Sequence, residues 1–583
     1  MILQALTRHY EDLLALGEIQ RPGWGLAKVS YGLQIDESGQ ILALLPLKVA
    51  REQGKKTVWA PRSMEVPMPS KHTVNIAPSF LCDNAGYLLG MDGKGKPERT
   101  QRCFEASKAL HLSLLEASNE PAARAICAFF ANWDPLQGRE HPILLPYEED
   151  LLSGANLIFW YGTQSVVDIA PIRQIWQAHY DQKGEGAQMP CLVTGKRGTV
   201  ARIHPAIKMI QGGQPSGMAL VSFNAPAFCS YGKEQSLNAP VSEYAAFAYT
   251  TALNHLLTDR AHVQVLGDMT IVCWAEGGER VYQDFGMASM YGTYGSEEPI
   301  SNADLRAALS ALARGESVDW QEQRLDPQTH FYILALSPNA SRLSVRFFLQ
   351  DTFGNIIRHL QEHHAQLEIV RPAYDQMETL PLWRLLAETV NPNAREKAAS
   401  PQMAGDVLRS ILTGGRYPAT LLNGVMLRIR AEREVTRGRA AILKAYYLRN
   451  AHQGCPEEVL QVQLNEASNY LPYVLGRLFS VLEAIQHAAN PGINATIRDK
   501  YFNSAAAMPA SIFPLLLNLA QKHLRKLDTG MRVYYDRQLC ELTARIQQTY
   551  PTRLTLAEQG AFQLGYYHQT QKRYTKKEDV QNA

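Results

Sequence analysis

One short segment comes close to a phosphate-binding pattern. Residues 90–96 (GMDGKGK) match the spacing G-x-x-x-x-G-K of a nucleotide-binding loop. Such a loop needs a Ser or Thr hydroxyl for Mg²⁺ directly afterwards and a helix that starts at the lysine. Here Pro97 follows, supplies no hydroxyl and biases Lys96 away from helical conformation. The segment therefore favours a basic turn over a nucleotide site.

Three histidines on a predicted helix raise the question of a metal. His359 and His363 are one helical turn apart and His364 is adjacent, but a zinc hydrolase would need H-E-x-x-H. Glu362 lies three residues after His359 rather than one, and no third ligand is evident. A polar helix face is the favoured interpretation. We predict no bound metal and no cofactor.

The residues 8–10 (RHY) could belong to an acid/base cluster, but nothing pairs with them at a recognisable spacing, so a helix surface is favoured. The chain has no G-x-S-x-G nucleophile elbow and no paired-carboxylate motif. The sequence makes no positive case for catalysis, and we expect a protein that is not an enzyme.

The segment 212–240 (GGQPSGMALVSFNAPAFCSYGKEQSLNAP) is rich in amides and hydroxyls. It holds four Gly, three Pro, four Ser, two Asn and two Gln, but only Lys233 and Glu234 are charged. Glycine lets a backbone approach a ligand closely, and amide side chains offer a donor and an acceptor side by side. These groups can contact base edges, so the segment favours recognition over bond-breaking chemistry.

Basic residues lie on either side of prolines and glycines before this segment. One group comes at 55–72 and the other comprises Lys196, Arg197, Arg202 and Lys208. Cations in such loops can reach phosphates while nearby amides read a few base pairs. A well-capped structural loop is the equally weighted alternative.

The elements that must position these loops are mixed at first and then helical. We predict a helix at 1–19, a hairpin at 26–48, a proline-rich loop at 55–78 and two helices in 97–131, the second beginning near Pro121. Strands are predicted at 157–169, 191–203, 270–275, 331–336 and 343–348, with helices at 242–257, capped by Ser242, and at 355–364. From about residue 380 the periodicity is helical, including 470–488 and a helix at 511–526 with Pro514 in its first turn.

This pattern predicts an α+β fold in which a mixed N-terminal region with several short sheets and helices precedes an all-α C-terminal helical bundle. We divide it into 1–265, 266–375 as a β-containing continuation, and 376–583 as the bundle.

Composition and charge fit a globular protein of several domains. The chain has 583 residues, 46% hydrophobic and 20% charged, with a formal net charge of +2. Residues 496–583 carry 13 Lys and Arg against 7 Asp and Glu, so this region is basic. None of the eight cysteines forms a C-x-x-C pair, and no run of 18 apolar residues exists. We expect a cytoplasmic protein without a membrane partner.

Several long segments resemble one known family. They include 192–257 (beginning LVTGKRGTVARIHP), the opening MILQALTRHY, FLCDNAGYLLG at 80–90 and NWDP at 132–135. Further matches are FYILALSPNASRLSVRFF at 331–348, RAAILKAYYLR at 439–449, NATIRDKYFNSAAAMPASIFPLLL at 494–517 and GYYHQ at 565–569. Together they span almost the whole chain. They resemble the large-subunit family of the type I-C CRISPR surveillance complex (type I-C Cascade).

The resemblance implies a non-catalytic subunit of an RNA-guided complex. Such a subunit recognises the protospacer-adjacent motif on duplex DNA, promotes strand opening and R-loop stabilisation, and helps recruit the helicase-nuclease. The implied partners are the guide CRISPR RNA ribonucleoprotein, target double-stranded DNA and its displaced strand, the backbone and handle-binding subunits, the small subunit, and a phage anti-CRISPR inhibitor. The last part of the chain, about 456–583, resembles the small subunit of such complexes.

Joining the resemblance to the residues gives a set of candidate DNA contacts. In the basic loops, phosphate contacts are predicted for Lys71, Lys196, Arg197, Arg202 and Lys208. Among the amides and hydroxyls, groove-edge contacts are predicted for Thr73, Asn75, Gln214, Ser216 and Asn224, and strand separation is predicted for Lys233 and Gln235 of the amide-rich segment. Tracking of the displaced single strand is predicted for the C-terminal cations Arg525, Lys526, Arg532 and Arg537. Two alternatives remain: a structural scaffold whose neighbouring subunit reads the motif, and a nucleic-acid enzyme.

Overall fold

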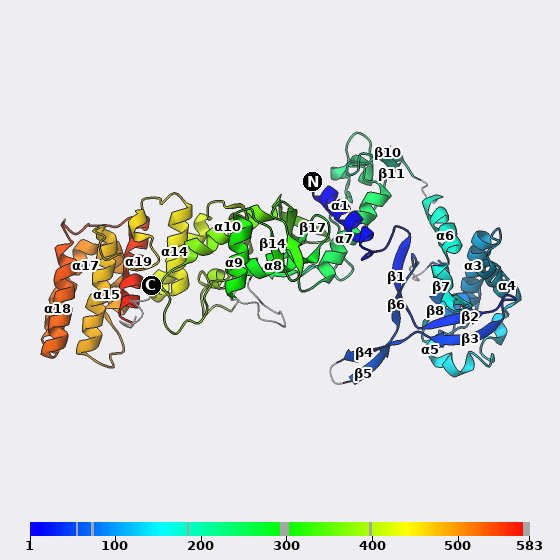
Figure 1. The fold of residues 1–583 in the computed structure, drawn as a ribbon, viewed down its shortest axis with the longest axis horizontal. Helices are drawn as coiled ribbons and strands as arrows, with labels where there is room; N and C mark the ends of the chain where they lie inside the picture. The colour runs from blue at the N-terminus through cyan, green and yellow to red at the C-terminus, as the bar shows by residue number, and fades with distance from the viewer. Residues whose placement is uncertain are drawn as a thin grey trace. The chain divides into compact units, whose positions relative to one another are not determined.

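The computed structural model describes residues 1–53, 56–70, 75–182, 186–291, 302–395, 399–547 and 549–574. The chain divides into two compact units (Figure 1). The first comprises Met1–Pro205 and Val221–Leu253, and the second comprises Ala206–Leu220 and Asn254–Ala583. Each unit is therefore built from two stretches of sequence. Our three-region division of the chain stays a prediction.

The first unit contains a five-stranded mixed sheet in the order β3-β2-β8-β7, with β9 paired to β8. Strand β2 runs antiparallel to β3 and parallel to β8. Three further antiparallel pairs are β1 with β6, β4 with β5, and β10 (Gln188–Pro190) with β11 (Arg197–Thr199). The strands are β1 (Trp24–Val29), β2 (Tyr31–Ile35), β3 (Ile41–Pro46), β4 (Val49–Gln53), β5 (Lys56–Ala60), β6 (Arg62–Pro67), β7 (Cys82–Asn84), β8 (Asn156–Tyr161) and β9 (Gln164–Ser165).

Helices pack on this sheet through an aromatic core. His111, Phe129, Phe130 and Phe159 pack against one another with ring centroids 4.8 to 5.9 Å apart. Burial lowers the pKa of His111 to about 4, so this ring is neutral and can accept a hydrogen bond from the Leu81 N–H. The helices are α2 (Ala85–Leu88), α3 (Pro97–Leu115), α4 (Pro121–Asn132), α5 (Glu148–Leu152) and α6 (Ala170–Gln182).

The N-terminal helix α1 (Ile2–Ala15) packs on α7 (Glu243–Thr258) rather than on that sheet. Tyr10 meets Tyr244 and Phe247 edge to face, at 6.2 and 5.8 Å between ring centroids. His9 and Tyr10 are almost fully buried. The expectation that the segment RHY is helix surface is therefore wrong for these two residues, because the apolar side of α1 includes them.

The second unit begins with an antiparallel sheet in the order β12-β13-β16-β17. Every residue of β13 is buried, as expected for a central strand. The elements are β12 (Gln264–Leu266), β13 (Met269–Ala275), β14 (Val318–Trp320), β15 (Gln323–Leu325), β16 (His330–Asn339), β17 (Arg342–Thr352), α8 (Arg280–Tyr291), α9 (Asn302–Ala313) and α10 (Phe353–Leu367).

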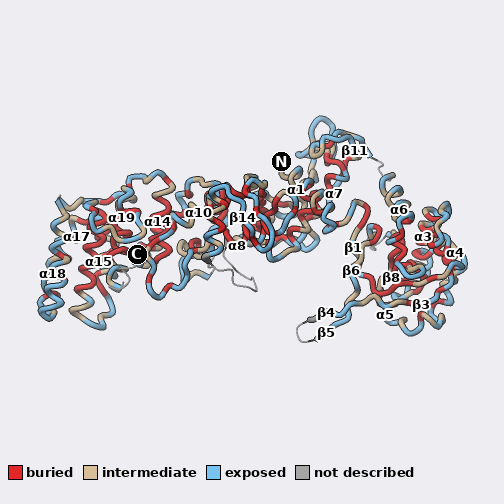
Figure 2. The backbone as a smooth tube through the Cα atoms, viewed as in Figure 1, coloured by how far each residue is buried: buried red, intermediate tan, exposed pale blue. Residues whose placement is uncertain are grey.

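The rest of the second unit is helical, and most residues of α14, α15 and α19 are buried (Figure 2). Thr555 and Glu558 form a capping box at the start of α19, and Thr496 and Asp499 do so for α16. The helices are α11 (Leu382–Ala387), α12 (Pro401–Thr413), α13 (Ala419–Glu432), α14 (Arg437–Arg449), α15 (Leu471–Ala489), α16 (Ile497–Ala507), α17 (Pro509–Leu524), α18 (Thr529–Ala544) and α19 (Leu556–Lys572).

These elements confirm the α+β prediction and correct four local expectations. The proline-rich loop at 55–78 contains strands β5 and β6, because prolines exclude helices but not edge strands. The predicted strand 157–169 ends at Tyr161, and of 191–203 only β11 (Arg197–Thr199) is a strand. Helix α17 begins at Pro509, so Pro514 lies inside the helix.

The three histidines of α10 have separate structural partners. His359 Nδ1 lies 2.9 Å from the Leu412 carbonyl oxygen, His363 Nδ1 lies 2.5 Å from the Tyr417 hydroxyl, and His364 Nε2 lies 3.4 Å from the Ser289 carbonyl oxygen. Burial holds the pKa of His363 well below its usual range. Within the described ranges, no group of three or more His, Cys, Asp or Glu side chains could hold a metal ion. Likewise, no described helix has the length and hydropathy needed for a bilayer crossing.

Candidate nucleic-acid interface

Lys196 and Arg197 lie at the turn between strand β10 (Gln188–Pro190) and β11. The turn closes through the Cys191 N–H, which donates to the Lys196 carbonyl at 2.9 Å, and through Gly195, whose φ of +72° needs glycine. The Cys191 thiol sulfur accepts from the Ser242 and Val193 N–H groups at 3.2 and 3.4 Å. This turn is therefore joined to the start of α7.

The electrostatics of Cys191 follow from these contacts. Burial alone would raise the pKa of its thiol, but hydrogen bonds from Ser242 and Thr194 lower that pKa to about 7. The sulfur acts as the acceptor that holds two backbone segments together.

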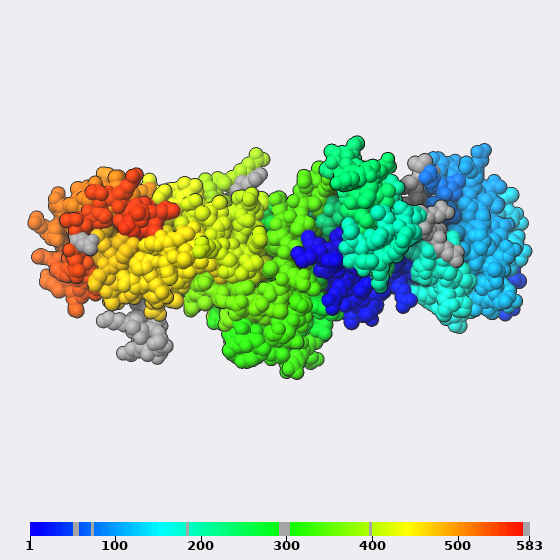
Figure 3. Space-filling view, turned by 90° about the horizontal axis from the view of Figure 1, so that it is seen from above, coloured from blue at the N-terminus to red at the C-terminus, as the bar shows by residue number. Residues whose placement is uncertain are grey.

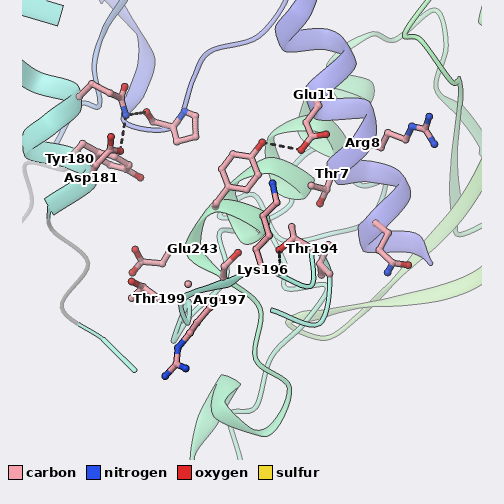
Figure 4. A pocket seen from close by; sticks show the side chains of 17 residues that line it. Thr7, Arg8, Glu11, Tyr180, Asp181, Thr194, Lys196, Arg197, Thr199 and Glu243 are labelled. Carbon is pink, nitrogen blue, oxygen red and sulfur yellow. Dashed lines mark hydrogen bonds between the residues drawn. The ribbon is translucent and has the colours of Figure 1, made fainter. Parts of the chain in front are cut away.

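A cavity of about 770 Å³ opens beside this turn (Figure 4). Its walls come from α1, α6, the turn and the first residues of α7. Lys196 and Arg197 extend from the turn in opposite directions. The charged side chains that line the cavity are Arg8, Lys196, Arg197, Glu11, Asp181 and Glu243. Tyr180 and Tyr244 are also in the lining, and the Tyr244 hydroxyl donates to Glu11 at 3.2 Å.

Arg202 and Gln235 are brought together although 33 residues separate them. The Arg202 Nε donates to Gln235 Oε1 at 3.0 Å, and its guanidinium lies 3.9 Å from Glu234. The Ser236 hydroxyl donates to the Arg202 carbonyl at 2.9 Å. Arg202 is thus partly neutralised and helps to fix the segment that carries Gln235. In the space-filling view this part of the chain, coloured teal to green, lies open at the surface (Figure 3).

Other predicted contacts of the first unit lie on exposed loops. Asn224 and Lys233 are exposed in the segment 221–242, and Asn75 is exposed after β6. The Ser70 N–H donates to the Ser79 hydroxyl at 3.1 Å, which closes the base of the loop that contains Asn75. Lys71 and Thr73 lie outside the described residues.

The amide-rich segment belongs partly to the second unit. Ile207 and Met218 pair, and the Gly217 N–H donates to the Gln214 carbonyl at 2.9 Å, so Gln214 and Ser216 occupy an exposed tight turn. Asn254 holds the base of this hairpin: its Oδ1 accepts from the Lys208 N–H at 2.8 Å and its Nδ2 donates to the Ala206 carbonyl at 3.1 Å. Lys208, Gln214 and Ser216 therefore share one small, anchored element.

The C-terminal cations lie around the connection of α17 and α18. Arg525 follows the end of α17, and Lys526 Nζ donates to Asn490 Oδ1 at 3.0 Å. On α18, Arg532 lies 3.8 Å from Asp536, and Arg537 lies 3.2 Å from Glu541. Two of these four predicted contacts are thus already in ion pairs.

Sequence reasoning missed the side of the cavity formed by α1 and α6. The sequence pattern predicts a plain helix surface for Arg8 and gives no functional signal at Tyr180. The relevant signal was the resemblance itself, which included the opening ten residues. The dipeptide Tyr231-Gly232 between polar residues is typical of a tight turn.

Fold and site together describe an α+β protein with exposed basic turns on anchored loops. The family model described as CRISPR-associated protein (Cas_Csd1) matches residues 6–574. The chain therefore belongs to this family of CRISPR-associated proteins. No curated protein matches it. The sequence-based resemblance is confirmed at this level.

Proposed function

We propose that this protein is the non-catalytic large subunit of a type I-C CRISPR RNA-guided surveillance complex. In this role it recognises the protospacer-adjacent motif on duplex DNA, promotes strand opening and R-loop stabilisation, and helps recruit the helicase-nuclease. The guide-RNA ribonucleoprotein, the neighbouring subunits and the target duplex are its partners. The family assignment over nearly the whole chain supports this proposal.

One observation carries the DNA-contacting part of the proposal. Lys196 and Arg197 are exposed, sit on a turn anchored by Cys191 and Ser242, and have no ion-pair partner among the described residues. A cation without an ion-pair partner loses only its bound water when it binds a phosphate, whereas a paired cation must first break its ion pair with a carboxylate.

The test uses the assembled complex and a duplex with or without the motif. We expect the double substitution Lys196→Gln and Arg197→Gln to weaken binding of the motif-bearing duplex roughly ten-fold, because two phosphate contacts are lost. The matched control is Arg314→Gln with Arg358→Gln, which removes the same charge from two exposed arginines already paired with Glu316 and Glu362. Equal binding by both double variants would overturn the site.

A second arm tests the role itself. A photocrosslinker in the motif should label this chain in the assembled complex. Labelling of a neighbouring subunit alone would favour the scaffold alternative. Cleavage of DNA by the purified chain with Mg²⁺ or Mn²⁺, retained after rigorous purification, would favour an enzyme.

A further inference from the structure

One aromatic side chain of the first unit is held entirely in solvent. The Lys233 N–H donates to the Ser230 carbonyl at 3.0 Å and closes a four-residue turn. Its central residues, Tyr231 and Gly232, have φ of 51° and 67°, which is the geometry of a type I′ turn. Tyr231 is 99% exposed, the largest value for a large hydrophobic residue in the part of the chain that the structure describes.

This conformation is unusual for tyrosine. A left-handed backbone brings Cβ close to the following carbonyl, so bulky residues avoid it, and Gly, Asn or Asp normally occupy such positions. Tyr231 contributes almost no buried area that would offset this strain. The stability of the loop therefore does not account for a tyrosine at position 231.

Asn238 holds the turn in place. Its Oδ1 accepts from the Ser230 N–H at 2.8 Å, and its Nδ2 donates to the Lys233 and Gln235 carbonyls, both at 2.9 Å. The Ser236 hydroxyl connects the same segment to the Arg202 carbonyl. These hydrogen bonds fix the turn that carries the ring, so binding a partner costs little conformational entropy of the backbone.

The surroundings of the ring indicate the chemistry of that partner. Ser230, Gly232, Lys233 and Glu234 are all exposed, and none is apolar; the nearest exposed apolar residue along the chain is Phe228, which is 43% exposed. An aromatic side chain next to an uncommitted cation matches a nucleotide: the base stacks on the ring and the phosphate meets the cation. A protein hot spot would instead sit in a pocket surrounded by apolar contacts.

We propose that Tyr231 stacks on a nucleobase of the target DNA that becomes unpaired beside the motif, with Asn238 as the positioning residue of the turn. This inference rests on the proposed function, and it adds a residue and a contact to it.

The experiment compares two substitutions of Tyr231 in the assembled complex. Tyr231→Asn removes the ring but suits the left-handed backbone, so the turn should survive; Tyr231→Trp keeps an aromatic surface. Opening of a motif-bearing duplex is followed with 2-aminopurine in the first base pairs beside the motif. We expect Tyr231→Asn to slow opening roughly ten-fold or more and Tyr231→Trp to stay near the wild-type rate. Asn238→Ala should also slow opening, although the ring is present.

A direct readout is photocrosslinking from 5-iodouracil placed in the same DNA positions. The crosslinked peptide should contain Tyr231, and the crosslink should vanish in Tyr231→Asn. Wild-type opening by Tyr231→Asn together with no crosslink would overturn this inference, while motif-dependent binding by the wild-type complex would leave the proposed function intact. A crosslink to Tyr231 only from 5-iodouracil in the guide RNA would overturn the assignment to DNA. Failure of Tyr231→Asn to join the complex would show a protein contact instead.

Discussion

Single residues of the candidate interface differ in whether an acid already neutralises them. Arg202, Arg532 and Arg537 lie within 4 Å of a carboxylate. For Lys196, Arg197, Lys208, Lys233 and Arg525 the described residues offer no such partner. Breaking an exposed ion pair costs at most about 1 kcal/mol. A paired cation therefore remains a candidate DNA contact, but a weaker one than an unpaired cation. The unpaired cations are the first to substitute.

A buried histidine gives the second unit a pH dependence. His262 Nδ1 lies 2.8 Å from Asp259 and its Nε2 lies 2.5 Å from Asp284, while Arg280 also contacts Asp259. Burial alone would lower the pKa of His262, but the two carboxylates outweigh it and raise that pKa above its usual value. The stabilisation is therefore fully present below the unfolded pKa of about 6.5 and is lost as pH rises through the higher folded value.

We accordingly expect His262→Asn to be most damaging at acidic pH. Near pH 6 it should lower the Tm by about 2 °C or more, which corresponds to roughly 1 kcal/mol for a charge-assisted hydrogen bond, and the difference should shrink by pH 8.5. Thermal unfolding of both proteins across this pH range measures it. A difference that is constant with pH would mean that the imidazole acts only by packing.

The sequence could place the candidate residues on loops, but not their state of pairing. The contact of Arg202 with Gln235 depends on a fold that brings residues 33 apart together. Exposure is equally hidden: a turn signal at Tyr231-Gly232 does not show that Tyr231 is 99% exposed. The sequence could predict which chemical groups can contact DNA, whereas it could not predict which of these groups are exposed and unpaired.

Helices α15 and α19 pack with their backbones in close contact. A Cβ added at Gly476 would lie 1.9 Å from the Phe562 carbonyl oxygen, and one at Gly565 would lie 2.2 Å from the Tyr473 carbonyl oxygen. Backbone meets backbone at both points, so no side chain can move aside. These glycines are required by the helix crossing rather than by a turn.

Substituting these glycines should destabilise the protein. We expect Gly476→Ala or Gly565→Ala to cost about 1–3 kcal/mol or more, because overpacking forces the helices apart. Gly530→Ala on the exposed side of α18 is the control and should change stability by no more than about 0.5 kcal/mol. Chemical denaturation compares the three. A similar loss in all three would show that helix crossing is not the cause.

Periodicity predicted α15 well because its stripe of apolar residues is long and regular. It failed at 191–203, where a thiol that accepts two backbone N–H groups produces a tight turn instead of a strand. It also failed at 56–67, since strands that pair with only one neighbour need little apolar alternation. Local hydrogen bonds to a side chain decide the first segment and backbone pairing decides the second, and neither depends on the hydrophobic pattern.

For the molecule as a whole, charge is nearly balanced at +2. A chain of this kind cannot attract DNA by its overall field, and only its local groups of cations can do so. Recognition would then depend on the geometry of the assembled complex rather than on bulk attraction.

We therefore expect the isolated chain to bind random duplex only weakly. Its Kd at physiological salt should be about 10⁻⁴–10⁻⁶ M, the range of non-specific electrostatic binding, and should rise steeply with added salt. Fluorescence anisotropy with a labelled duplex at several salt concentrations measures this. Nanomolar, salt-insensitive binding by the chain alone would contradict it.

The way the chain passes between its two units has a consequence for biosynthesis. Residues Ala206–Leu220 belong to the second unit, and Ala219 pairs with Arg342 of β17. At about 5–20 residues per second, the ribosome delivers that partner roughly 6–25 s after Ala219. The first unit, by contrast, is complete once Leu253 has emerged. During translation the segment 206–220 therefore lacks its partner in β17 until Arg342 is synthesised, and this interval is the period when a chaperone has most to protect.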